Sequence, residues 1–102
     1  MTIEISDKDL FRTEAFIGGQ WVSADDGGTL DIINPATGVG IAKVARCGTA
    51  ETRRAIEAAH AAQVEWRERT VKERSAILRR WFELMMESQE DLAQILTAEQ
   101  GK

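Results

Sequence analysis

The chain has 102 residues, enough for one small domain that buries roughly two-thirds of its extended-chain surface. Its 43% hydrophobic and 29% charged residues are typical of a folded soluble protein and exclude a disordered chain. The 13 basic and 17 acidic residues give a net charge of −4 and are mixed along the chain, so no dense basic patch supports nucleic-acid binding.

The N-terminal region and the cysteine content indicate a compartment. Cys47 is the only cysteine, so an internal disulfide is excluded, which fits a reducing environment. Residues 1–14 are predicted to be an extended lead-in. Their charged first dozen residues have neither the apolar core of a secretion signal nor the length of a membrane span. These features predict a cytoplasmic protein that binds no membrane.

Residues 15–46 are predicted to form two β-hairpins. The pair Gly18–Gly19 separates two short apolar runs and supplies the positive φ angles that a two-residue hairpin turn requires. After a polar loop, a strand ending at Ile33 is followed by the turn Asn34–Gly38, in which proline sets one φ angle. The second strand of this hairpin is expected to end near Val44.

Residues 49–102 show the three-and-four spacing of apolar side chains that is typical of helices, and two or three amphipathic helices are expected. The first is predicted to have Thr49 as its N-cap and Glu51 in its first turn, where a carboxylate complements the helix dipole. Its alanine-rich body suits close packing, and Trp66 is expected in the connection that follows it.

Two further helix starts are predicted. In the stretch TVKE, the Thr70 hydroxyl and the Glu73 carboxylate have the spacing of a capping box, and Ser88 with Asp91 has the same spacing. The apolar stripes of these helices are wide for so short a chain, so self-association is predicted. The side chains proposed for this contact are Trp81, Leu84, Met85, Leu92, Ile95 and Leu96.

Few residues are candidates for chemistry. Cys47 lies beside Arg46 and a predicted helix start, but no motif supplies a general base, so a structural cysteine is the preferred interpretation. His60 is the only histidine and has no cysteine or histidine partner at metal-ligand spacing. The glycine pairs lack the strand–GxGxxG–helix context of phosphate binding and are interpreted as turn residues. No catalytic, cofactor-binding or metal-binding residue is predicted in this α+β unit.

Several stretches, taken in order, resemble the N-terminal segment of the aldehyde dehydrogenase superfamily. FIGGQWV (Phe16–Val22) is similar to the opening hairpin of that family, and INPATG (Ile33–Gly38) is similar to its recurrent turn. AIEAAHAA followed by Trp66 resembles the first helix. The stretch Lys72–Lys102 resembles the next helical pair and is most similar to that of the bacterial succinate-semialdehyde dehydrogenases.

The resemblance implies an α/β parent enzyme, several times longer, that oxidises succinate semialdehyde to succinate with NAD or NADP. In the family, the catalytic cysteine and glutamate lie downstream of the matched region, and Cys47 is not in the catalytic-cysteine motif. Residues 1–102 then correspond to the N-terminal portion of the cofactor-binding domain, without the catalytic domain. In some relatives, backbone carbonyls near the strand containing Ile32–Ile33 bind a monovalent cation; no site is assigned here.

The same resemblance predicts that Lys102 marks a cut inside the cofactor-binding domain, because EQGK leads into further chain in the family. The chain alone is therefore expected to be catalytically inactive and to bind no cofactor. Two alternatives stay open. One is a truncated gene product that acts as a helix-mediated interaction module, and the other is a dehydrogenase for a different aldehyde.

Overall fold

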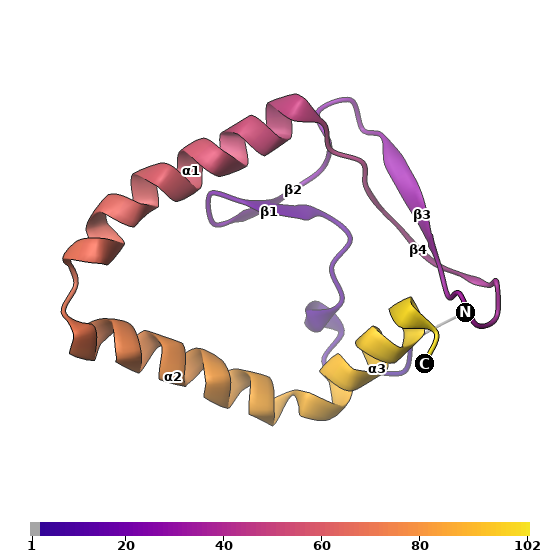
Figure 1. Cartoon of the computed structure of the whole chain (residues 1–102). Helices are drawn as coiled ribbons and strands as arrows, with labels where there is room; N and C mark the ends of the chain where they lie inside the picture. Colours follow the sequence, from indigo (N-terminus) through magenta and orange to yellow (C-terminus); the bar gives the residue numbers. More distant parts are fainter. Residues whose placement is uncertain (1–2) are drawn as a thin grey trace.

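The computed structural model describes residues 3–102, which form a short 3-10 helix, two β-hairpins and three α-helices in that order (Figure 1). The elements are η1 (Lys8–Leu10), β1 (Ala15–Ile17), β2 (Gln20–Val22), β3 (Thr29–Ile33), β4 (Gly40–Ala45), α1 (Thr49–Glu68), α2 (Val71–Glu87) and α3 (Gln89–Gln100). The predicted α+β architecture is confirmed. The lead-in differs from a fully extended segment because the Asp7 carboxylate caps η1 by accepting a hydrogen bond from the Asp9 amide at 3.0 Å.

β1 and β2 pair antiparallel around the Gly18–Gly19 turn, with Phe16 opposite Trp21. Both glycines have positive φ angles, 58° and 79°, as a two-residue turn requires. The rings of Phe16 and Trp21 have centroids 4.9 Å apart, and the Arg12 guanidinium lies 4.7 Å from the Trp21 ring centroid. These contacts stabilise a hairpin whose strands have only three residues each.

β3 and β4 also pair antiparallel, with a bulge between Ile32 and Ile33. Asn34 organises the turn between them. Its side-chain oxygen accepts a hydrogen bond from the Ala36 amide at 2.9 Å, and its carbonyl accepts one from the Gly38 amide at 2.8 Å. The turn predicted from NPATG is confirmed by these hydrogen bonds, and the Asn34 side chain is buried within it.

α1 differs from the prediction at both ends. Its N-cap is Gly48, and Thr49 is the first helical residue. Glycine has no side chain to cap the helix, and the Glu51 carboxylate accepts a hydrogen bond from the Gly48 amide at 3.3 Å. The helix continues to Glu68, which places Trp66 in its last turn and not in the connection. No glycine or proline interrupts residues 49–68, so the helix continues past Trp66 through residues that favour helix formation.

α2 begins at the predicted capping box. The Thr70 hydroxyl accepts a hydrogen bond from the Glu73 amide at 3.1 Å, and the Glu73 carboxylate accepts one from the Thr70 amide at 3.4 Å. Arg69, in an extended conformation, separates this start from the end of α1. The boundary between α1 and α2 is therefore set by local chemistry.

The second predicted capping box, Ser88 with Asp91, is wrong. The Ser88 side chain makes no capping hydrogen bond to α3. The Asp91 carboxylate instead accepts hydrogen bonds from the backbone amides of Ser6 and Asp7, each at 2.9 Å. A partner about 85 positions away along the chain has replaced the local one, so the carboxylate ties α3 to the N-terminal segment.

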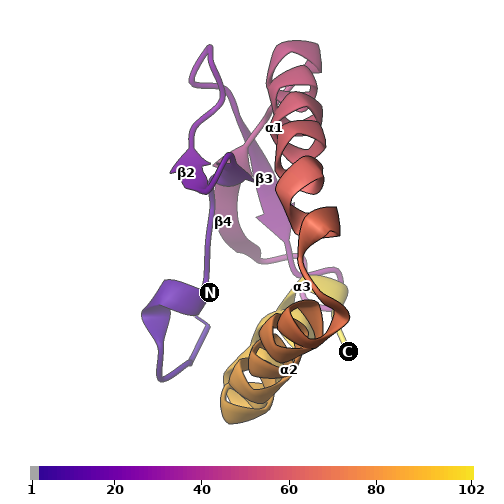
Figure 2. The same ribbon diagram turned by 90° about the vertical axis from the view of Figure 1, so that its left-hand side faces the viewer.

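The elements enclose an open ring (Figures 1 and 2). α1 and α2 follow one another around it, and α3 returns the chain to the β3–β4 turn. Gly101 ends α3 in the left-handed conformation, with φ of 74°. It approaches the turn so closely that a Cβ there would lie 2.7 Å from the Ala36 nitrogen and 2.9 Å from the Pro35 Cγ.

The described residues form almost no core. Their buried apolar side chains are Ile5, Ala24 and Ala98, and no large side chain among them is fully buried. The radius of gyration is 16.5 Å, whereas a compact domain of this length has about 13 Å. The apolar faces of the helices are thus left largely in contact with solvent. No helix in residues 3–102 has the length and hydrophobicity to span a membrane.

Candidate functional site

Charged side chains connect the loop between β2 and β3 to the first turns of α1. The Asp25 carboxylate accepts two hydrogen bonds from the Arg54 guanidinium, at 2.8 and 2.7 Å. The Glu51 carboxylate, on a residue only 6% exposed, accepts hydrogen bonds from the amides of Asp25 at 3.1 Å and Gly48 at 3.3 Å. Loop and helix are thereby joined beside a hollow of about 610 Å³ that Cys47 also lines.

The electrostatics of this group keep its members charged. The hydrogen bonds from Arg54 hold the pKa of Asp25 below its usual value, and Asp25 in turn raises the pKa of Arg54. The pKa of Glu51 is lowered chiefly by the hydrogen bond from the Asp25 amide. A general acid or base needs a pKa near the working pH. These shifts lead away from it, so the group acts as a structural tie.

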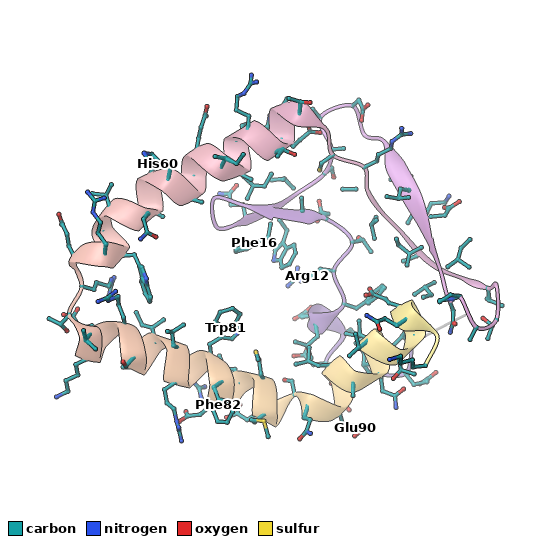
Figure 3. The ribbon with its side chains drawn as sticks, in the orientation of Figure 1. Arg12, Phe16, His60, Trp81, Phe82 and Glu90 are labelled. Carbon is teal, nitrogen blue, oxygen red and sulfur yellow. The ribbon has the colours of Figure 1, made fainter. Side chains whose placement is uncertain are left out.

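Cys47 is half-buried and free, and no hydrogen bond joins its thiol to a base within residues 3–102. His60 is exposed in the middle of α1 (Figure 3), whereas Cys47 precedes this helix. No three Cys, His, Asp or Glu side chains of the described part of the chain gather as a metal site. The structural interpretation of Cys47 stays a prediction.

The N-terminus of α1 carries a carboxylate of its own. Helix N-termini bind anions through free amides, but here the Glu51 carboxylate already accepts from the Gly48 amide and adds negative charge. The Gly18–Gly19 pair belongs to a hairpin turn, as interpreted from the sequence. Ile32–Ile33 lie at the bulge of β3.

The side chains proposed for self-association are divided between two environments. Leu92 and Ile95 are half-buried on α3, the element that the N-terminal segment and the β3–β4 turn contact. The others are exposed, and Trp81 points toward the inside of the ring (Figure 3). The exposed fractions are 60% for Trp81, 45% for Leu84, 44% for Met85 and 57% for Leu96.

Sequence reasoning missed three contacts between distant segments. They are the Asp25–Arg54 pair, the Asp91 carboxylate on the N-terminal amides, and the approach of Gly101 to the β3–β4 turn. The sequence signals pointed to local roles: a polar loop, a capping box and a helix C-terminus. Sequence reasoning placed Glu51 correctly in the first turn of α1. It did not predict the second hydrogen bond to the Glu51 carboxylate, which comes from the Asp25 amide in the β2–β3 loop.

Residues 21–102, from β2 to the end of the chain, match the family model described as the aldehyde dehydrogenase family. The chain belongs to the aldehyde dehydrogenase family. The resemblance found in the hairpins and helices is therefore confirmed. The matched range contains β3, β4 and the three α-helices.

Curated aldehyde dehydrogenases are similar to nearly the whole chain. It is 58% identical over 100 residues to the glutarate-semialdehyde dehydrogenase of Pseudomonas putida strain KT2440, and 52% identical to the 3-sulfolactaldehyde dehydrogenase of Pseudomonas putida. It is 49% identical to the succinate-semialdehyde dehydrogenase (NADP(+)) GabD of Escherichia coli. Each alignment covers 98% of this chain and 21% of the relative, so the chain spans about a fifth of their length.

The fold is also that of a solved aldehyde dehydrogenase. The crystal structure of succinate-semialdehyde dehydrogenase from Burkholderia pseudomallei is similar with a TM-score of 0.89 and 51% sequence identity. The similarity covers 92% of this chain and 20% of that chain. The open arrangement of hairpins and helices is therefore like that of a segment of a much longer enzyme.

Proposed function

We propose that this chain forms the N-terminal part of the cofactor-binding domain of an NAD(P)-dependent dehydrogenase that oxidises succinate semialdehyde to succinate. The observation that carries the proposal is the near full-length match to aldehyde dehydrogenases, of which the chain spans only about a fifth. The scarcity of buried apolar side chains supports it, because a segment that belongs to a larger domain leaves its helix faces for the remaining chain to cover.

The names of the relatives define a substrate class. Succinate and glutarate semialdehydes each carry an aldehyde and a distant carboxylate, and 3-sulfolactaldehyde carries an aldehyde and a sulfonate. The shared chemistry is a short aldehyde with an anion at its far end. We take succinate semialdehyde as the substrate and glutarate semialdehyde as its competitor, since relatives of both kinds are about half identical to the chain or more.

The 102-residue chain is proposed to be inactive by itself. NAD or NADP accepts the hydride in this reaction, and the Glu51 carboxylate places negative charge at the N-terminus of α1, which disfavours a phosphate there. Cys47 has no hydrogen-bonded base to form a thiolate nucleophile. What the chain contributes is scaffold: two hairpins and three helices held by the contacts of Asp25, Glu51 and Asp91.

The proposal is tested on the gene product isolated from its native cell. Its intact mass is measured, and NAD(P)H formation is followed with succinate semialdehyde, glutarate semialdehyde and each nucleotide in turn. We expect a mass several-fold above 11.3 kDa, peptides that continue past Lys102, and the highest kcat/KM with succinate semialdehyde. The purified 102-residue chain is assayed in parallel and is expected to give no turnover above the blank.

Each part of the proposal has its own contradicting result. A native product with the mass of this chain alone excludes the longer parent and favours the interaction module. A higher kcat/KM with glutarate semialdehyde reassigns the substrate and keeps the enzyme class. Turnover by the purified chain, abolished by Cys47→Ser, refutes the scaffold role.

A further inference from the structure

We draw no further inference here: the strongest candidate, the exposed apolar side of α2 with Leu78, Phe82 and Met86, carries none because nothing in the structure shows what covers it.

Discussion

At the scale of single residues, Asp91 shows how one carboxylate can be diverted from its local role. Its position three residues after Ser88 matches a capping box, yet both its oxygens accept hydrogen bonds from Ser6 and Asp7. Backbone amides of an otherwise extended segment have no partner of their own. A carboxylate on α3 satisfies two of them at once and so fixes where the N-terminal segment runs.

The pH dependence of this attachment follows from the lowered pKa of Asp91, whose chief cause is the hydrogen bond from the Ser6 amide. A carboxylate with a depressed folded pKa stabilises the fold above its unfolded pKa, and that contribution is lost as pH falls through the folded pKa. We expect the NMR amide shifts of Ser6 and Asp7 to be constant near neutral pH and to move only below the ordinary aspartate range. Asp91→Asn should abolish this titration and speed amide exchange of both residues.

At the scale of elements, α1 and α2 begin in different ways. α2 uses the Thr70 hydroxyl and the Glu73 carboxylate in a reciprocal box. α1 has glycine at its N-cap and relies on Glu51, which also accepts from the Asp25 amide of the preceding loop. The start of α2 is therefore local, whereas the start of α1 depends on the loop being in place.

Thr70→Ala removes one acceptor at the start of α2 and is expected to destabilise its first turn by about 1 kcal/mol. Amide exchange at Glu73 and its neighbours measures this loss. Thr70→Ser keeps the hydroxyl and should stay within a few tenths of a kcal/mol. Equal exchange in both variants would show that the hydroxyl does not hold the turn.

At the scale of the whole molecule, the ring is closed by a few contacts and not by a core. Asp25 with Arg54 joins the hairpins to α1, Asp91 joins α3 to the N-terminal segment, and Gly101 abuts the β3–β4 turn. α2 spans the gap between α1 and α3 with its apolar faces exposed. An architecture of this kind suits a segment around which further chain packs.

Gly101→Ala tests the closure of the ring. Alanine at this positive φ costs about 1 kcal/mol, and its Cβ would lie closer than 3 Å to the backbone of Ala36. We expect α3 to withdraw from the turn, with faster amide exchange at Ala36 and Gly38 and a lower melting temperature. Gly40→Ala, where a Cβ meets nothing within 4 Å and φ is not positive, is the matched control. Equal effects of the two variants would contradict a closing role for Gly101.

Much of the local structure could be predicted from the sequence. Gly18–Gly19 and NPATG marked both hairpin turns, and Thr70 with Glu73 marked the start of α2. Trp66 was misplaced because α1 lacks a stop signal until Arg69 adopts an extended conformation. The Ser88–Asp91 spacing gave a wrong prediction because the Asp91 carboxylate can either cap a helix locally or bind the amides of a distant segment. The absence of a catalytic centre among residues 1–102 stays a prediction that the activity assay tests.

The sequence by itself determined the order and type of the helices and strands, because turns, caps and helical stripes depend on residues a few positions apart. The family followed from the resemblance of whole stretches in order. Only the tertiary structure decided how they are arranged: that Asp91 binds Ser6 and Asp7, and that Gly101 meets Pro35 and Ala36. Such contacts join residues more than sixty positions apart. Their geometry depends on the path of the whole chain, which no local pattern records.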